Sequence, residues 1–391
     1  MALLRVTNLK VTVPSGGGMV EIVRGVSFGV AAGRALAVVG ETGSGAAACV
    51  RALVGLPPGA RVSGEAMFDG TDLLGLDARS LRRIRGASIG VLPGGAGASS
   101  GRAGASIGMP AGRAGASIRV LPGGAGASIG VLDGEAGAPA GGAGLHPLYR
   151  VGTQIGWLIR SRDRGVGRAE ARRRAVELLG RTGVDHPDRR AGEYPHQLSA
   201  GTRRRVMIAM ALALGPRLLI AEEPTAGLDP TVAADILDQV DRLRRESGVA
   251  LLLATRDLAL AARAADEIVM MYAGRIVERA ATDTIRRNPH HPYTKGLLES
   301  LPGAPAPRHR PPIPGEPPGP SAVPPGCPFH PRCHYAMPVC AAELPPLARV
   351  TGDGDHASAC WLPHEARGLG ETAEALRLHF SRPDAGGGGR P

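Results

Sequence analysis

The stretch that decides the fold reads ALAVVGETGSG at residues 35–45. Five apolar residues at 35–39 predict a short buried strand, and the glycines that follow predict a tight turn into a helix. Such a turn lets backbone N–H groups and a helix N-terminus point at phosphate. The next two positions would hold a lysine for the β- and γ-phosphates and a hydroxyl for Mg²⁺, but here they are Ala46 and Ala47. The stretch therefore predicts a phosphate-binding loop that lacks its usual side-chain ligands.

Short apolar runs alternate with helical patterns along the rest of the chain. Runs that predict buried strands lie at 218–221, 249–254 and 268–272. Apolar residues at helical spacing follow Asp229-Pro230-Thr231, a helix start, and residues 169–180 also predict an amphipathic helix. Residues 271–278 predict a closing hairpin around Gly274. This alternation predicts an α/β fold with a parallel sheet.

Residues 86–144 consist almost wholly of glycine, alanine, serine, proline and a few aliphatic residues, in tandem units such as GASIGVLPGGA. The units could be short strands joined by turns, as in a solenoid. So small a unit carries few large apolar groups to offset its ordering entropy, which favours a loosely packed insert. A second biased stretch, 302–326, is rich in proline and glycine and predicts a semi-rigid linker.

Four of the five cysteines cluster near the C-terminus: Cys327, Cys333, Cys340 and Cys360. In a cytosolic protein such clustering indicates a metal site rather than disulfides. Four thiolates suit either a [4Fe–4S] cluster or a structural Zn²⁺. The spacing alone favours neither, and free thiols rank behind both. The fifth cysteine, Cys49, falls on the helix after the loop and is predicted to be a small buried residue.

Composition and charge exclude several classes of function. The 391 residues allow two or three domains. The longest apolar run is too short for a membrane span, and the N-terminal segment lacks the apolar region of a signal peptide. The formal net charge is +11, but aromatic residues make up only 3%, too few for a base-stacking surface. We therefore expect a cytosolic protein with no nucleic-acid partner.

Several segments after the loop resemble motifs of the ABC transporter ATPases. YPHQLSAGTRRRVMIAMAL at 194–212 resembles their signature segment, LLIAEEPT at 218–225 their Walker B strand, and AGLD at 226–229 their D-loop. NPHHPYT at 288–294 and the cysteine cluster resemble the C-terminal extension of the oligopeptide/dipeptide-importing branch. The resemblance extends over most of the chain, from Leu3 to about Leu362, except the repeat.

The resemblance implies a RecA-like P-loop core with an antiparallel β portion, a helical signature subdomain and a C-terminal extension that contains the cysteines. The implied domains are a nucleotide-binding domain at 1–285 (insert 86–144, helical subdomain about 145–212), the HPYT segment and linker at 286–326, a four-cysteine module at 327–362, and a partly disordered tail at 363–391.

The resemblance also carries functional roles onto matching positions. Nucleotide contacts fall on Gly40, Glu41, Thr42, Gly43, Ser44, Gly45, Ala46, Ala47, Glu222 and Arg256. Glu223 is the candidate general base and Asp229 the D-loop residue. The signature, which acts on a partner's nucleotide, falls on Leu198, Ser199, Ala200, Gly201 and Thr202. ATP and Mg²⁺ are the implied cofactors, and the resemblance favours a [4Fe–4S] cluster over Zn²⁺ at the four cysteines.

Several positions depart from the family's pattern. Ala46 and Ala47 replace the lysine and serine of the loop, Glu222 stands for the Walker B aspartate, and Arg256 stands for the switch histidine. No glutamine precedes Gln154, so the Q-loop glutamine, whose expected place lies in the repeat, has no counterpart. We therefore expect an impaired nucleotide site, and ATP hydrolysis, the family's activity, stays open for this chain.

The leading interpretation is an ATP-binding subunit of a peptide or dipeptide importer that supplies its signature motif to a partner's ATP site. The implied partners are a second ABC ATPase subunit in a heterodimer, two membrane permease subunits and an extracellular solute-binding protein. The implied location is the cytoplasmic face of the cell membrane. Two alternatives remain: a nucleotide-free structural or regulatory subunit, and a metal- or cluster-binding protein on a decayed ATPase scaffold.

Overall fold

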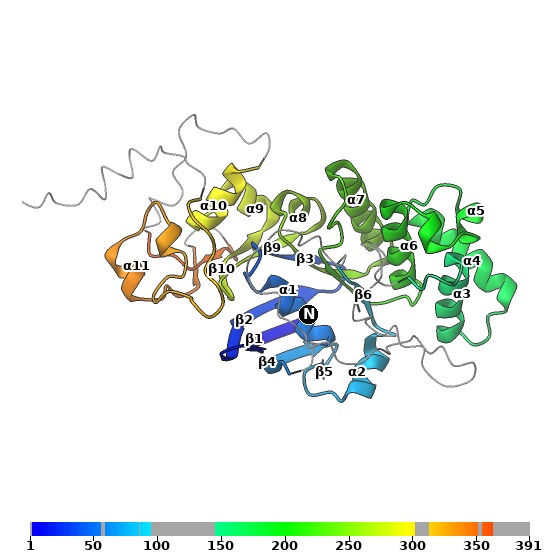
Figure 1. The fold of residues 1–391 in the computed structure, drawn as a ribbon, viewed down its shortest axis with the longest axis horizontal. Helices are drawn as coiled ribbons and strands as arrows, with labels where there is room; N and C mark the ends of the chain where they lie inside the picture. The colour runs from blue at the N-terminus through cyan, green and yellow to red at the C-terminus, as the bar shows by residue number, and fades with distance from the viewer. Residues whose placement is uncertain are drawn as a thin grey trace, which may run out of the picture.

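The computed structural model describes residues 2–55, 59–85, 87–94, 145–301, 313–350 and 354–362. Its strands form a four-stranded sheet and an eight-stranded sheet. In Figure 1 the four-stranded sheet lies beneath the central sheet, with a helical lobe at one end of the molecule and the C-terminal module at the other. This is the α/β architecture with antiparallel and helical portions that the sequence predicts.

The four-stranded sheet is antiparallel throughout, in the order β2-β1-β4-β5. Its strands are β1 (Ala2–Ser15), β2 (Gly18–Ala31), β4 (Arg61–Phe68) and β5 (Thr71–Asp72). Apolar residues alternate with polar ones along β1, so one face of this sheet is buried. That face packs with α1 (Ala46–Val54) and one face of the central sheet into a single core, which includes Leu4, Val23 and Cys49.

The central sheet has the order β11-β12-β10-β9-β3-β8-β7-β6. Its strands are β3 (Ala35–Val39), β6 (Ile89–Leu92), β7 (Leu218–Glu222), β8 (Ala250–Thr255), β9 (Glu267–Tyr272), β10 (Arg275–Ala281), β11 (Ala348–Arg349) and β12 (Ala357–Ser358). β3 pairs in parallel with β8 and β9, and β7 with β6 and β8. The predicted strands and the β9–β10 hairpin are thus confirmed. Parallel pairing brings the carboxyl ends of β3, β7 and β8 to one edge, where the phosphate loop begins.

The beginning of the repeat differs from the expected loose insert. Residues 89–92 of its first unit form β6, which pairs with β7 and buries Ile89 and Leu92 to 1% exposure. These aliphatic side chains are few, but a neighbouring strand and core already exist for them to pack against. Residues 89–92 therefore belong to the central sheet rather than to a loosely packed insert. The units from Gly97 onward, like the tail at 363–391, lie outside the described residues.

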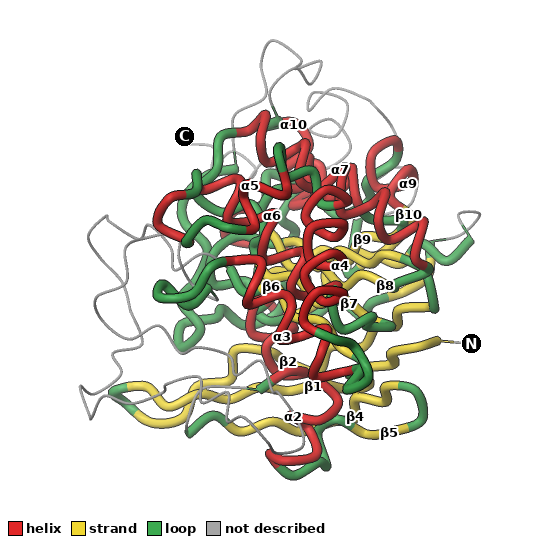
Figure 2. The backbone as a smooth tube through the Cα atoms, turned by 90° about the vertical axis from the view of Figure 1, so that its right-hand side faces the viewer, coloured by secondary structure: helices red, strands yellow, loops and turns green. Residues whose placement is uncertain are grey.

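The helices cover both faces of the central sheet and build the helical lobe. They are α2 (Ala78–Arg85), α3 (Val151–Arg162), α4 (Arg168–Arg181), α5 (Pro187–Ala191), α6 (Ala200–Leu212), α7 (Pro230–Ser247), α8 (Leu258–Ala264), α9 (Thr282–Arg287), α10 (Pro292–Glu299) and α11 (Pro338–Ala342). Figure 2, seen from the lobe end, shows α3, α4 and α6 in front of the strands. Among the described residues we find no helix with the length and hydropathy needed to cross a bilayer.

The four-cysteine module packs directly on the core of the central sheet. Its strand β12 extends the central sheet by pairing with β10, and Ala359 N–H donates to the Val277 carbonyl at 2.8 Å. Cys327 and Phe329 belong to the same buried cluster as the central strands. In the described residues the proline-rich stretch therefore leads into a module that is continuous with the core of the central sheet.

Candidate nucleotide site and cysteine pocket

The phosphate loop runs from the end of β3 to the start of α1. Gly45 caps α1 in the left-handed region with φ +93°, and a Cβ there would lie 2.5 Å from the Ile22 carbonyl oxygen. Ser44 N–H donates to the Glu41 carbonyl at 2.9 Å, which closes the turn. Only glycine fits the crowded position 45 without strain. The backbone cradle that the sequence predicts is present, and Ala46, 6% exposed, begins the helix where a lysine would reach for phosphate.

The carboxylate of Glu222, at the end of β7, is paired with an arginine of α1. Arg51 Nε donates to Glu222 Oε2 at 2.7 Å, and its Nη2 contacts Oε1. The Glu222 side chain is only 14% exposed, whereas that of Arg51 is 56% exposed. The hydrogen bonds to Glu222 raise the pKa of Arg51 above its ordinary value. Glu222, expected to face Mg²⁺, thus already has a cation against it.

The next residue, Glu223, is held by the arginine at the switch position. Arg256 donates to Glu223 Oε1 from its backbone N–H at 3.0 Å and from Nε at 3.2 Å. Its Nη1 reaches Thr42 Oγ1 at 3.3 Å, so Arg256 joins the phosphate loop to the candidate base. Burial raises the pKa of Glu223, although the charge of Arg256 and its hydrogen bonds oppose the shift. Glu223 also has φ +38°, an uncommon conformation for glutamate.

Gly94 follows β6 and lies against the two carboxylate-bearing residues. A Cβ added to it would be 3.2 Å from the Glu222 carbonyl oxygen and 3.5 Å from Glu223 Cβ. The carbonyl of the preceding Pro93 accepts a hydrogen bond from Arg204 of α6 at 2.8 Å. A segment of the repeat therefore reaches the candidate site with a residue that has no side chain.

The signature residues gather at the start of α6, in the helical lobe (Figure 1). Ser199 caps this helix, because its Oγ accepts the Thr202 N–H at 3.2 Å. Leu198 is buried, whereas Ser199 and Ala200 are exposed. A Cβ at Gly201 would lie 3.0 Å from Cγ1 of Val232, a residue of α7. α7 is itself capped by Asp229, whose Oδ1 accepts the Val232 N–H at 3.0 Å. Val232 therefore contacts both the signature, at Gly201, and the D-loop, at Asp229.

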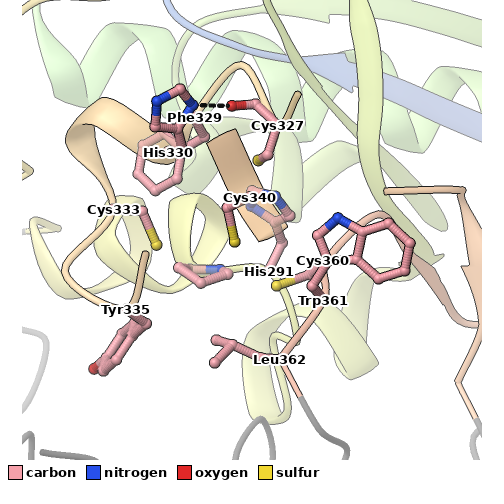
Figure 3. Close-up of a pocket in the computed structure, with 11 residues that line it drawn as sticks. His291, Cys327, Phe329, His330, Cys333, Tyr335, Cys340, Cys360, Trp361 and Leu362 are labelled. Atoms are coloured by element: carbon pink, nitrogen blue, oxygen red, sulfur yellow. Dashed lines mark hydrogen bonds between the residues drawn. The ribbon is translucent and has the colours of Figure 1, made fainter. Parts of the chain in front are cut away.

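The four cysteines line one pocket, shown in Figure 3. Cys327 and Cys333 flank the 3₁₀ turn η2 (His330–Arg332), Cys340 lies in α11, and Cys360 follows β12. His330 Nδ1 lies 2.9 Å from the Cys327 carbonyl oxygen. The structure thus brings together four thiols from separate segments of the module.

The pocket is small, and burial acts on the pKa of two of its thiols. Burial raises the pKa of Cys333 to about 12, with a smaller contribution from the charges of the other three cysteines, and burial likewise raises the pKa of Cys327. The cavity volume is about 10 Å³, enough for one water-sized sphere. Across the described ranges, no group of three or more His, Cys, Asp or Glu side chains is arranged to hold a metal ion. The donor set suits a thiolate-bound metal, but the lining side chains would have to move to admit a cluster.

Two family models match this chain. The ABC transporter model matches residues 23–226, and the model for the C-terminal region of oligopeptide/dipeptide transporters matches residues 277–340. The chain belongs to the ABC transporter family, in its oligopeptide/dipeptide branch. The phosphate loop, the signature segment and the Walker B strand fall inside the first match, and NPHHPYT at 288–294 falls inside the second.

Curated relatives of this ABC protein agree with that membership. The oligopeptide transport ATP-binding protein OppD of Bacillus subtilis is 34% identical over 385 residues, which is 97% of this chain and 94% of that protein. The dipeptide transport ATP-binding protein DppD of the same organism is 34% identical over 368 residues and is covered to 94%. OppD of Mycobacterium tuberculosis is 40% identical over 361 residues, but the chain spans only 51% of its length.

Solved structures support the fold of this ABC protein. A dimeric ATP-binding cassette in a post-hydrolysis state with ADP and Pi matches with a TM-score of 0.53 and 21% identity, over 71% of this chain and 98% of that chain. CbiO1 from Clostridium perfringens, part of the ABC transporter complex CbiONQ, matches with a TM-score of 0.52 and 19% identity. The match covers 76% of this chain and 93% of that chain. At these identities the likeness establishes the cassette architecture alone.

Sequence reasoning about this ABC protein missed the residues that reach the site from outside its motifs. Arg51 lies six residues beyond the end of the loop, and its pairing with Glu222 joins residues 171 positions apart. Gly94 lies within the repeat, where glycines are so frequent that none stands out. Tyr293 and Arg332 contact Glu41 from the C-terminal extension. The HPYT segment was a recognised motif, so its position beside the loop could have been suspected, but no local pattern marks the other residues.

Proposed function

We propose that this chain is the ATP-binding subunit of a peptide or dipeptide ABC importer and that its own nucleotide site is impaired. In this proposal the chain contributes its signature, Leu198–Thr202, to the ATP site built on a partner's Walker motifs. The observation that carries the proposal is the double pairing of the site's carboxylates, Glu222 with Arg51 and Glu223 with Arg256.

The alanines of the loop account for weak nucleotide binding. A charge-assisted hydrogen bond contributes roughly 1.5–3 kcal/mol, and a tenfold change in affinity corresponds to about 1.4 kcal/mol. Replacing the loop lysine with Ala46 should therefore weaken phosphate binding roughly ten- to hundredfold. Ala47 removes the hydroxyl that would hold Mg²⁺, so the loss extends to the metal.

The residues present do not fit Mg²⁺ at this site. ATP would supply the phosphoanhydride and Mg²⁺ would neutralise its phosphates, with the loop backbone as their cradle. Glu222 instead holds the Arg51 guanidinium, which must be displaced before the carboxylate can act as a ligand. Oε1 of Glu223 accepts two hydrogen bonds from Arg256, so this atom must release both donors before it can take a proton from water. We therefore assign no hydrolytic step to this chain's own loop.

The signature motif has the properties needed to serve a partner's site. Ser199 and Ala200 are exposed at the N-terminus of α6, where helix N–H groups favour an anion. We propose a heterodimer with a second ABC ATPase subunit whose own loop is intact. Two membrane permease subunits and an extracellular solute-binding protein complete the proposed importer, with this chain at the cytoplasmic face of the membrane.

The experiment that tests this proposal compares two glutamates in the assembled complex. Glu223→Gln should leave ATP turnover within about twofold, because that site contributes little, whereas the equivalent change in the partner should abolish it. Glu246→Gln, on the exposed surface of α7, is the matched control. A collapse of turnover in Glu223→Gln with the control intact would contradict the impairment. Failure of the chain to co-purify with permease subunits would instead favour the alternative of a separate metal- or cluster-binding protein.

A second proposal concerns the cysteine pocket. The convergence of four thiols supports a [4Fe–4S] cluster as its occupant, with Zn²⁺ as the alternative. Binding would displace protons from Cys327 and Cys333, because burial raises the pKa of both thiols. Protein purified without oxygen should be brown and contain iron and sulfide. A colourless protein with one zinc per chain would exclude the cluster.

A further inference from the structure

Two buried side chains from the C-terminal extension hold Glu41, the second residue of the phosphate loop. The Tyr293 hydroxyl oxygen accepts the Glu41 N–H at 3.0 Å. Arg332 donates from Nη1 to Glu41 Oε2 at 2.8 Å and from Nη2 to Oε1 at 3.4 Å. Tyr293 is fully buried and Arg332 is 7% exposed. Both the backbone and the carboxylate of Glu41 are therefore fixed from outside the loop.

Arg332 is itself held before it reaches the loop. It lies in η2, between two cysteines of the pocket, and its Nε donates to the Pro314 carbonyl at 2.9 Å. Nη2 also donates to the Gly315 carbonyl at 3.2 Å, and Nη1 to the Tyr272 hydroxyl at 3.3 Å. A guanidinium presents its donors in a rigid planar fork. Because the other N–H groups of Arg332 are hydrogen-bonded, the guanidinium can approach the Glu41 carboxylate in only one orientation.

Aromatic packing joins the cysteine pocket to this contact. The rings of Tyr272 and Tyr293 meet edge-on, with centroids 4.9 Å apart, and Phe329 packs against both at 5.2 and 5.5 Å. Phe329 also lines the cysteine pocket, as Figure 3 shows. One continuous apolar contact thus runs from the pocket to the residues that hold the loop.

The HPYT segment is anchored to the central sheet by a buried carboxylate. Glu278 of β10 accepts the N–H groups of His290 and His291 at 2.6 and 3.0 Å. His291 Nδ1 in turn caps α10 by accepting the Tyr293 N–H at 3.1 Å. Because its support is rigid, the Tyr293 hydroxyl presents a fixed acceptor to Glu41.

Glu41 matters because the rest of the loop folds back on it. Its carbonyl accepts the Ser44 N–H, and the Ser44 carbonyl accepts the Gly274 N–H at 2.8 Å. We propose that Arg332 and Tyr293 are positioning residues of the phosphate loop, through which the C-terminal extension keeps the empty loop in its phosphate-binding shape. The inference concerns the loop without nucleotide, so it stands or fails independently of the proposed impairment.

Amide hydrogen exchange of the full chain without nucleotide tests this inference, because exchange reports local opening. Arg332→Gln should speed exchange in a peptide covering residues 40–47 roughly ten- to hundredfold, the loss expected for charge-assisted hydrogen bonds. Arg332→Lys keeps the charge without the fork and should restore part of the protection. Arg349→Gln, which breaks an exposed ion pair with Asp355 in the same module, is the matched control and should change nothing.

Peptides from β1 and β2 report the global fold in the same samples. Glu41→Gln should resemble Arg332→Gln, and the double variant should exchange no faster than either single variant, because both remove one contact. Unchanged exchange at 40–47 in Arg332→Gln, or effects that multiply in the double variant, would overturn the inference. If Arg332→Gln also speeds exchange in β1 and β2, the second variant Tyr293→Phe decides, because it removes only one oxygen atom. Faster exchange confined to residues 40–47 in this variant supports the inference. Unchanged exchange there refutes it.

Discussion

The guanidinium of Arg51 lies against the carboxylate of Glu222, with Nε 2.7 Å from Oε2. This contact joins the helix after the phosphate loop to the end of β7, and it occupies the acid expected to face Mg²⁺. A cation supplied by the chain itself therefore neutralises the centre of the candidate site.

Removing that cation should destabilise the fold. Arg51→Met keeps most of the side-chain volume but leaves the largely buried Glu222 carboxylate without a partner. We expect the free energy of unfolding to fall by about 1–2 kcal/mol, a modest value because Arg51 is more than half exposed. Urea denaturation measures it, with Arg51→Lys as the charge-preserving control. Equal stability of Arg51→Met and the parent chain would refute a stabilising pair.

Restoring the missing ligands should restore nucleotide binding. The double variant Ala46→Lys/Ala47→Ser places a cation and a hydroxyl at the start of α1, where the backbone cradle is already formed. We expect ATP affinity to rise by roughly ten- to hundredfold, as measured by calorimetry on the purified chain. Ala46→Met, of similar length but uncharged, should give no increase. An unchanged affinity in the double variant would mean that the cradle itself is defective.

The pH dependence of stability should carry a contribution from Glu223. Burial raises its folded pKa above the ordinary value, so the folded state binds the proton more tightly than the unfolded state does. Stability is then lost as pH rises through the interval from the ordinary glutamate pKa to the raised one. Relative to the parent chain, Glu223→Gln should gain stability as pH rises through that interval. The exposed Glu246→Gln serves as control, and a difference that does not change with pH would contradict the raised pKa.

Cys49 should resist alkylation in the folded protein. It is fully buried, and burial raises its pKa to about 12, so in mildly alkaline solution almost none of it is the reactive thiolate. Mass spectrometry after iodoacetamide treatment should find Cys49 unmodified in buffer and modified in urea. Modification in buffer at the rate seen in urea would show that the helix after the loop opens readily.

Glu278 should anchor the C-terminal extension to the cassette. It is fully buried and accepts hydrogen bonds from two backbone N–H groups, while His356 Nε2 lies 2.7 Å from Oε1. Glu278→Ala leaves these groups without their acceptor and should cost roughly 3 kcal/mol of unfolding free energy. Thermal unfolding measures the cost, with Glu246→Ala as the control. Limited proteolysis should cut the variant first within 288–362; cleavage spread evenly along the chain would argue against a local anchor.

The central strands, the capped helices and the phosphate loop were predictable because their signals are local. Buried parallel strands are short apolar runs, as at 35–39 and 250–255. Asp229 followed by proline starts α7 where the pattern indicates. The strand β6 was missed because it has the same composition as the repeat units that follow it. Composition indicates whether a segment can fold alone. It does not show that a neighbouring strand, here β7, is available to pair with the segment and bury its side chains.

Local sequence patterns are enough to identify the cassette, the family branch, the substitutions at 46, 47 and 256, and the clustering of four cysteines along the chain. The ion pairs follow from tertiary packing: Arg51 with Glu222, Arg256 with Glu223, and Arg332 with Glu41. Secondary structure depends on neighbours within a few positions, so periodicity and capping residues reveal it. An ion pair between residues up to 291 positions apart depends on how strands and helices pack, and no local pattern contains that information.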